Sequence, residues 1–191
     1  MYYVAGRHAK KKIVDQYIRN LMKQLNIHRF TKRDIAIEFQ SKLDDDADGL
    51  CIGDTKEVYL TIATKDKSFM RQMQALAHEM VHARQFLRGQ LTCVGGFAWK
   101  GRKASGYEYE NQPWEKEAYK LERDLFLDCF PFDELARINN IKFYSISSLK
   151  TKEIWIDREK LEIVLNNIIS NYKKEATVTL LQKNSLSLLK V

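Results

Sequence analysis

His78-Glu79-Met80-Val81-His82 is the stretch that decides how the rest of this chain is interpreted. Two histidines four positions apart lie on one face of a helix, so both ring nitrogens can reach a single metal ion at roughly 2.0–2.1 Å. Glu79 lies about 100° further round the helix, where it can take a proton from a water molecule that the metal activates. The run is the HExxH pattern of zinc hydrolases. It predicts His78 and His82 as ligands of a Zn²⁺ ion and Glu79 as the general base.

The residues around this run have the periodicity of an amphipathic helix over 66–87. Apolar residues occupy the side opposite His78: Phe69, Met73, Leu76, Met80, Ala83 and Leu87. His82 shares the other side with polar residues: Arg71, Gln74 and Gln85. We therefore expect the apolar side to pack on the core and the histidines to face a metal site, and not to serve as core residues.

A catalytic zinc ion usually has three protein ligands and one open position for water. Because no histidine follows His82, the third ligand is expected to be a carboxylate or a cysteine. The best candidates lie in residues 113–130, where a proline and early acidic residues predict the start of a second helix. Glu115 and Glu117 are about 200° apart on that helix, so only one of them can face the ion.

Glu117 is the preferred third ligand. Its small neighbour Ala118 would let the second helix approach the metal helix closely. Glu115, in contrast, suits a helix N-terminus, where a carboxylate is stabilised without any metal. The alternatives are Glu115, Cys93, Cys129 or another carboxylate.

Three segments together resemble a known group of proteins. These are the HExxH run with Ala83-Arg84-Gln85, then Trp99-Lys100-Gly101, and then Pro113-Trp114-Glu115-Lys116-Glu117-Ala118. They are similar to the SprT-like or minimal-zincin metallopeptidase domains that tailed bacteriophages often encode, and the likeness covers residues 10–135. SprT and Spartan proteins have a third histidine and, in SprT, a zinc ribbon of paired cysteines, and this chain has neither.

The resemblance implies an α+β, zincin-like fold. A small mixed or antiparallel sheet would pack on the HExxH helix, and a second helix would carry the third ligand. It also implies Zn²⁺ at His78, His82 and Glu117 with Glu79 as base, as in gluzincins, where a small residue follows the ligand glutamate. Many gluzincins have an aspartate four residues further on, where this chain has Leu121.

Upstream of the metal helix, the sequence predicts a helix over residues 9–25 that covers the sheet. Strands are predicted over residues 35–39, 50–52 and 58–62. In zincins an antiparallel edge strand runs beside the cleft, and an extended substrate can pair with that edge. By this resemblance, residues 58–63 are the candidate edge strand.

Asp44-Asp45-Asp46-Ala47-Asp48-Gly49 matches the first half of an EF-hand loop. Position twelve of such a loop should be a bidentate glutamate, and here it is Thr55. The flanking residues also read as strands and not as helices. We therefore expect a polar turn between strands, with weak calcium binding as the alternative.

Residues 91–111 are rich in glycine, aromatic and basic residues, and they predict a loop or ribbon that joins the two metal-binding helices. Such a segment would stand over the cleft. There Tyr107 or Tyr109 could hydrogen-bond the oxyanion of a tetrahedral intermediate, and Tyr109 is the preferred catalytic candidate. Simple packing of the aromatic rings is the alternative.

Length and composition are those of a small enzyme. The 191 residues are 45% hydrophobic, which predicts a metallopeptidase domain over residues 1–140 and a C-terminal extension over residues 141–191 packed on it. No run approaches the ~20 apolar residues of a membrane helix, so we expect no membrane contact and a cytoplasmic location, which is the host cytoplasm for a viral protein. The three cysteines lack a CxxC pairing and are expected to be reduced thiols.

The net charge of +7 comes partly from basic clusters at residues 7–12 and 100–103. We interpret these as solvated surface, with weak nucleic-acid contact as the alternative.

Taken together, the motifs predict a zinc-dependent endopeptidase that acts on a protein or peptide substrate. A catalytically inactive zincin-fold protein that binds protein or DNA through a structural metal site is the second hypothesis. Metal-dependent hydrolysis of something other than a peptide is the third, and it requires a cleft without a free strand edge.

Overall fold

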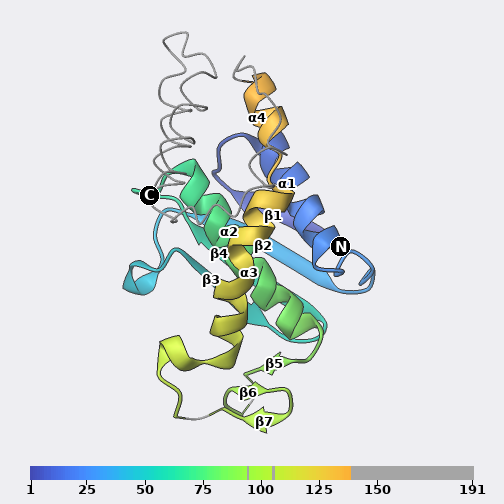
Figure 1. Cartoon of the computed structure of the whole chain (residues 1–191), viewed down its shortest axis with the longest axis vertical. Coiled ribbons are helices and arrows are strands. Elements are labelled where there is room, and N and C mark those ends of the chain that lie inside the picture. Colours follow the sequence, from blue (N-terminus) through green and yellow to red (C-terminus); the bar gives the residue numbers. More distant parts are fainter. Residues whose placement is uncertain (94, 105, 139–191) are drawn as a thin grey trace, which may run out of the picture. The chain divides into compact units, whose positions relative to one another are not determined.

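The computed structural model describes residues 1–93, 95–104 and 106–138, and the chain divides after Phe130 into two units, Met1–Phe130 and Pro131–Val191 (Figure 1). The first unit contains every predicted site residue. The second contributes one described helix, α4 (Phe132–Ile138). The C-terminal extension predicted over residues 141–191 lies outside the described residues.

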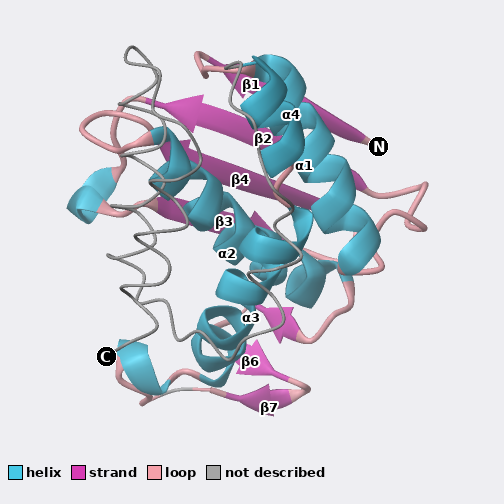
Figure 2. Cartoon of the chain, turned by 45° about the horizontal axis from the view of Figure 1, so that its top comes forward, coloured by secondary structure: helices cyan, strands magenta, loops and turns pink. Residues whose placement is uncertain are grey.

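A four-stranded mixed sheet forms one layer of the first unit, with the strand order β1-β2-β4-β3 (Figure 2). The strands are β1 (Tyr2–Gly6), β2 (Asp34–Gln40), β3 (Gly49–Gly53) and β4 (Glu57–Ala63). β1 and β4 both run parallel to β2, whereas β3 is antiparallel to β4. The structure therefore confirms an α+β fold with a small mixed sheet, and it confirms the three predicted strands. β1 was not predicted.

The position of β4 corrects the prediction of the edge strand. Residues 58–63 lie between β2 and β3, so that prediction is wrong; among the described strands β1 and β3 are at the two edges of the sheet, and β3 is the edge strand that contacts α2. The alternation of buried Val58, Leu60 and Ile62 with more exposed residues shows which face of β4 is covered. This alternation does not show whether a neighbouring strand pairs with β4, because strands pair through backbone hydrogen bonds at their edges and not through the side chains on their faces.

Helices α1 (Lys11–Gln24) and α2 (Phe69–Leu87) lie on the same face of the sheet (Figure 2). α1 confirms the helix predicted over residues 9–25, and α2 confirms the one over residues 66–87. Their apolar sides meet the sheet in one core: Val14, Ile18, Leu21, Ile37, Leu60, Ile62, Met73 and Leu76. The hydroxyl of buried Tyr17 donates a hydrogen bond of 3.2 Å to the carbonyl of Met73, which ties the two helices together.

Helix α3 (Pro113–Cys129) packs on α2 and, to a lesser extent, on α1. It confirms the second helix predicted over residues 113–130. The segment before it forms a small antiparallel sheet of β5 (Leu91–Thr92), β6 (Ala98–Trp99) and β7 (Arg102–Lys103), followed by the short helix η2 (Tyr109–Asn111). Figure 1 shows this ribbon beside the N-terminal end of α3. Phe97 stacks on Trp114 with ring centroids 5.5 Å apart, so the ribbon is fastened to the start of α3.

The acidic run at residues 44–49 forms the short helix η1 (Asp44–Asp46) and a turn, as predicted. Asp48 accepts a hydrogen bond of 2.6 Å from Lys67 and pairs with Arg71, which fastens the turn to the start of α2. Although partial burial works against the charged form, Lys67 and Arg71 lower the pKa of Asp48. Since two cations already occupy this carboxylate, the structure favours the polar turn over a calcium site.

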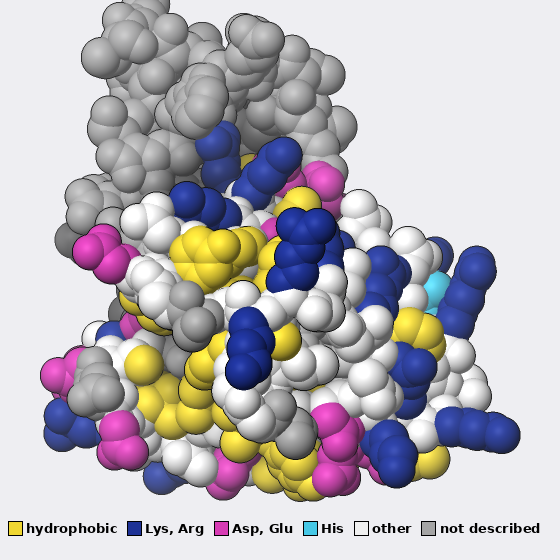
Figure 3. Space-filling model, turned by 90° about the horizontal axis from the view of Figure 1, so that it is seen from below, with side chains coloured by type: hydrophobic (Ala, Val, Ile, Leu, Met, Phe, Trp, Pro, Cys, Tyr) yellow, Lys and Arg dark blue, Asp and Glu magenta, His cyan; other side chains and the backbone are white. Residues whose placement is uncertain are grey.

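No helix in the described parts of the chain is long and apolar enough to cross a bilayer. Figure 3 shows the face at the small-sheet end of the molecule. Lys and Arg side chains are spread over it with acidic and apolar side chains between them. This spread fits a solvated surface, and weak nucleic-acid contact stays a prediction.

Candidate metal centre

Helix α2 holds the two histidines on successive turns. The helix begins after Ser68, whose hydroxyl accepts a hydrogen bond of 3.2 Å from the backbone N–H of Arg71, as an N-cap residue does. The Nε2 atoms of His78 and His82 lie 3.1 Å apart. Both side chains are buried, so the polar side of the helix is covered by another part of the protein and does not face open solvent.

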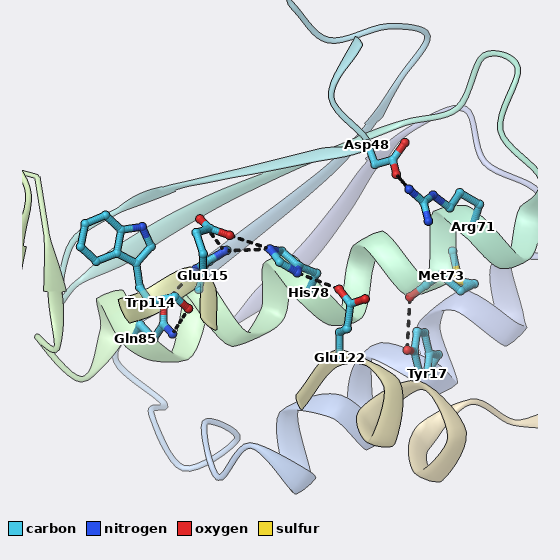
Figure 4. A network of polar contacts seen from close by, with 10 residues as sticks. Tyr17, Asp48, Arg71, Met73, His78, Gln85, Trp114, Glu115 and Glu122 are labelled. Carbon is cyan, nitrogen blue, oxygen red and sulfur yellow. Dashed lines mark hydrogen bonds and ion pairs between the residues drawn. The ribbon is translucent and has the colours of Figure 1, made fainter. Parts of the chain in front are cut away.

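That cover is the first turn of α3, and it brings a carboxylate to both histidines. Glu115 Oε2 lies 3.2 Å from His78 Nε2, and Glu115 Oε1 lies 3.4 Å from His82 Nε2 (Figure 4). Glu115 is as buried as the histidines. Within the described residues, His78, His82 and Glu115 are the one group of histidine, cysteine or acidic side chains placed to hold a metal ion.

The spacing of these atoms fits a small tetrahedral ion. Ligands that each lie about 2.0–2.1 Å from a tetrahedral zinc ion are about 3.3–3.4 Å from one another. Here the two Nε2 atoms are 3.1 Å apart, and they lie 3.2 and 3.4 Å from the Oε2 and Oε1 atoms of Glu115, respectively. Two imidazole nitrogens and one carboxylate oxygen are also the donors of a common type of catalytic zinc site. The donor set therefore fits Zn²⁺, although other divalent metals accept the same donors.

Glu117, the preferred third ligand, does not lie at the histidines. Its Oε2 accepts a hydrogen bond of 2.8 Å from Gln85 Nε2 and lies 3.1 Å from Arg84. Ala118 is fully buried, as expected of a residue at a close helix contact. However, Ala118 is only about 60° from Glu115 round the helix and about 100° from Glu117. Close packing at Ala118 therefore turns Glu115, and not Glu117, towards the histidines, so the group that could hold a metal ion is His78, His82 and Glu115.

The cysteine alternatives are also not at the site. Cys93 is exposed and its thiol points to the carbonyl of Gly53 at 3.9 Å. Cys129 is the last residue of α3, fourteen residues and about 21 Å of helix beyond Glu115. Neither cysteine belongs to the metal-binding group.

A second carboxylate from α3 contacts His78 from the other side. Glu122 Oε2 lies 2.8 Å from His78 Nδ1, so His78 is held between Glu115 and Glu122 (Figure 4). With its proton on Nδ1 donated to Glu122, the ring presents the lone pair of Nε2 to a metal. Sequence reasoning missed Glu122. The sequence feature that could have identified Glu122 is its spacing of seven residues from Glu115, which puts both carboxylates on one side of α3.

Gln85 orients the other histidine and was also missed as a site residue. Its Oε1 accepts a hydrogen bond of 2.8 Å from His82 Nδ1, and its Nε2 donates to the carbonyl of Trp114 at 3.1 Å and to Glu117. The Gln85 side chain is completely buried. One amide thus sets the orientation of His82 and links α2 to the turn of α3 that carries Glu115.

Glu79 lies buried beside the ligands. Burial is the main cause that raises the pKa of Glu79 to about 7; His82 and His78 oppose this shift, and Glu115 and Glu122 add to it. A carboxylate with a pKa near neutrality can accept a proton and return it at physiological pH. The environment of Glu79 therefore suits the general base that the sequence predicts.

The other ionisable groups show how strongly the site favours positive charge. Burial alone would lower the pKa of His78, but hydrogen bonds to Glu115 and Glu122 raise it to about 9. Burial likewise opposes ionisation of Glu115, but hydrogen bonds from His78 and His82 lower its pKa to about 2. Three carboxylates, Glu79, Glu115 and Glu122, surround two imidazoles, and without a metal this surplus is met by a proton on His78. A metal cation can take the place of that proton.

Tyr109, the predicted catalytic tyrosine, lies next to the ligand Glu115. Partial burial of its hydroxyl, the charge of Glu115 and hydrogen bonds with Tyr119 and Glu115 raise the Tyr109 pKa well above its ordinary value. The Tyr119 ring in turn packs edge-on against His78, with centroids 4.8 Å apart. Tyr107 is exposed on the approach to η2. The structure thus brings Tyr109 to the metal-binding group, and its action on an oxyanion stays a prediction.

Comparison with protein-family models, with curated proteins and with solved structures gave no match to this chain. The likeness to SprT-like domains therefore remains a prediction from the segments quoted above.

Proposed function

We propose that this protein is a zinc-dependent metallopeptidase of the HExxH…E type, with a zincin-like arrangement of its two metal-binding helices. His78, His82 and Glu115 would hold the zinc ion, and Glu79 would be the general base. The observation that carries the proposal is the buried cluster of two histidines and one carboxylate beside a buried glutamate: the two Nε2 atoms lie 3.1 Å apart, and each lies 3.2–3.4 Å from one of the two oxygens of Glu115. The SprT-like relationship and the bacteriophage origin are part of the same proposal and rest on the sequence motifs.

Three protein ligands favour a catalytic site over a structural one. A structural zinc site is normally closed by a fourth protein ligand, whereas a catalytic site leaves that position to water or substrate. The metal-binding group in the described residues has three members. This count supports an enzyme over the alternative of an inactive zincin-fold protein that uses the metal only to bind a protein or DNA partner.

The roles of the residues follow from their positions. A bound Zn²⁺ would supply a Lewis acid for a carbonyl oxygen and would lower the pKa of a water molecule. Glu79 would accept the proton of the attacking water and pass it to the leaving amine, which its pKa of about 7 allows. Glu122 and Gln85 would keep the two histidine rings in the orientation that metal binding needs.

An edge strand next to Glu79 favours a peptide substrate. Within the described residues, β3 is the last strand on its side of the sheet, and Gly49 at its start lies directly against Glu79. An extended peptide can add to such an edge through backbone hydrogen bonds, which would bring its carbonyl groups towards the base. Hydrolysis of another bond type would not need this edge, so we place it behind peptide hydrolysis.

The metal ligands can be tested by elemental analysis of purified protein. We expect about one zinc per chain in the wild type and a sharp loss in His78→Ala and in Glu115→Ala. Glu117→Ala is the matched control: it removes the same side chain two residues away, and we expect it to keep the zinc. Zinc that survives Glu115→Ala but not Glu117→Ala would overturn the ligand set.

Catalysis is tested separately with Glu79→Gln, which preserves the shape of the side chain but removes the base. We expect this variant to bind zinc as the wild type does and to lose cleavage of an unfolded protein substrate by about 10²-fold or more. Wild-type cleavage by Glu79→Gln would refute the assigned base. A zinc-loaded wild type that cleaves no unfolded protein or peptide would favour the binding-protein alternative.

A further inference from the structure

We propose that Gly49, at the start of the edge strand β3, is a positioning residue for Glu79, because its missing side chain leaves the space that Glu79 occupies. A Cβ atom placed on Gly49 would lie 2.7 Å from both Cγ and Oε1 of Glu79 and 3.0 Å from its Cδ. Carbon atoms that are not bonded pack at about 3.5–4.0 Å. Any residue other than glycine at position 49 would therefore overlap with Glu79.

The space, and not the backbone conformation, is what requires glycine here. The φ angle of Gly49 lies outside the left-handed range that only glycine adopts easily, in contrast to Gly6, with φ of 82°, and Gly89, with φ of 65°. Gly49 pairs in regular antiparallel register with Ile62 of β4. Since a strand residue with this geometry can normally carry a side chain, the contact with Glu79 is the distinguishing feature.

The contact also limits where Glu79 can go. Because Cγ would be as close to the new Cβ as the carboxylate oxygen, a rotation of the carboxylate alone would not relieve the overlap. Either the whole Glu79 side chain would have to leave the space under β3, or α2 and β3 would have to move apart. Gly49 thus lets Glu79 lie buried between α2 and the edge strand β3.

The steric coupling can be measured without a substrate or a metal. Gly49→Ala is made in the wild type, in Glu79→Ala and in Glu79→Gln, and thermal unfolding of the full chain is followed by circular dichroism in the presence of a chelator. In the wild type and in Glu79→Gln, which has the same shape, we expect Gly49→Ala to lower Tm by about 3–8 °C. In Glu79→Ala the overlapping atoms are gone, and alanine suits a strand better than glycine, so Tm should stay or rise slightly.

Gly53, at the other end of β3, is the matched control. A Cβ atom on Gly53 would lie 2.4 Å from the carbonyl oxygen of Glu57 and 2.7 Å from Cα of Val58. These are backbone atoms that no change at position 79 removes. Gly53→Ala should therefore destabilise all three backgrounds to the same extent.

Equal effects of Gly49→Ala in the wild type and in Glu79→Ala would overturn the proposal, whether both lose stability or neither does. If Gly49→Ala alone does not fold, a folded Gly49→Ala/Glu79→Ala protein would support the proposal, and a double variant that also fails to fold would refute it.

The consequence for catalysis rests on the proposed function. Gly49→Ala should keep its zinc but lose peptide cleavage mainly in kcat. A wild type without peptidase activity would refute the proposed function and leave the coupling result unchanged.

Discussion

Replacing Gln85 with leucine removes the amide that joins the two metal-binding helices. Leucine has a similar volume, so the change removes three hydrogen bonds without opening a large cavity. One buried group loses its protein partner, the Nδ1–H of His82; the carbonyl of Trp114 loses a second contact but lies inside α3, where the helix provides its backbone partner. Glu117 also loses its hydrogen bond from Gln85, but it keeps its contact with Arg84 and is partly exposed, so this loss costs little stability.

The magnitude follows from that unsatisfied donor. A buried donor or acceptor without a partner costs about 1–3 kcal/mol, and the added apolar surface of leucine offsets part of this cost. We expect Gln85→Leu to lower the free energy of unfolding of the metal-free protein by about 1–2 kcal/mol. Loss of a hydrogen bond to a ligating histidine typically weakens metal binding about 10–100-fold, which is about 1.4–2.7 kcal/mol.

Two assays separate these effects. Zinc affinity is measured by competition with a chelating dye, and the free energy of unfolding by urea denaturation in the presence of a chelator. Gln72→Leu is the control, because Gln72 lies on the same helix and donates a hydrogen bond of 3.0 Å to the carbonyl of Lys67, far from the ligands. We expect it to leave zinc affinity unchanged. A zinc affinity for Gln85→Leu within about twofold of the wild type would refute the role assigned to this amide.

Three further predictions concern the charged groups. Glu122→Gln should weaken zinc binding about tenfold in the same dye assay, because an amide is a poorer acceptor for the Nδ1–H of His78; unchanged affinity would contradict this. Asp48→Asn should lower the urea-derived free energy of unfolding by about 1 kcal/mol, since Lys67 and Arg71 lose their shared anion, and added calcium should not change the wild-type value. Finally, the raised pKa of His78, about 9 against 6.5, stabilises the metal-free protein below pH 6.5, and this contribution is lost as the pH rises through 9. The pKa of Glu79 is raised from 4.5 to about 7, so Glu79 also lowers the stability of the metal-free protein as the pH rises from 4.5 to 7. The rise in Tm on adding zinc should therefore be larger at about pH 8.5 than at about pH 6.5, and an equal or smaller rise would argue against zinc replacing that proton.

The parts of the fold that the sequence predicts are those determined by local spacing. The period of apolar residues in α1 and α2 depends only on which side of each helix is covered, and the structure confirms both helices. The histidines of the HExxH run are brought together by the helix itself. The three predicted strands were likewise recognisable from alternation and β-branched residues.

What the sequence did not predict depends on which elements become neighbours. β1 is a five-residue strand whose place is set by parallel pairing with β2, more than thirty residues further along the chain. The edge position of β3 is a property of the whole sheet, and β4 alone does not show it. Local periodicity reports the covered face of an element and says little about its partners.

The choice between Glu115 and Glu117 belongs to the same class of problem, since it depends on how α3 is rotated against α2. Two residues of α2 stabilise that rotation together with the close packing at Ala118: Arg84 pairs with Glu117, and Gln85 binds both Glu117 and the carbonyl of Trp114. With Glu117 held there, the opposite side of α3 turns Glu115 towards the histidines. Arg84 and Gln85 follow His82 almost directly in sequence. The eight residues 78–85 therefore contain two proposed ligands, the proposed base and two side chains that help to turn the proposed third ligand towards them from another helix.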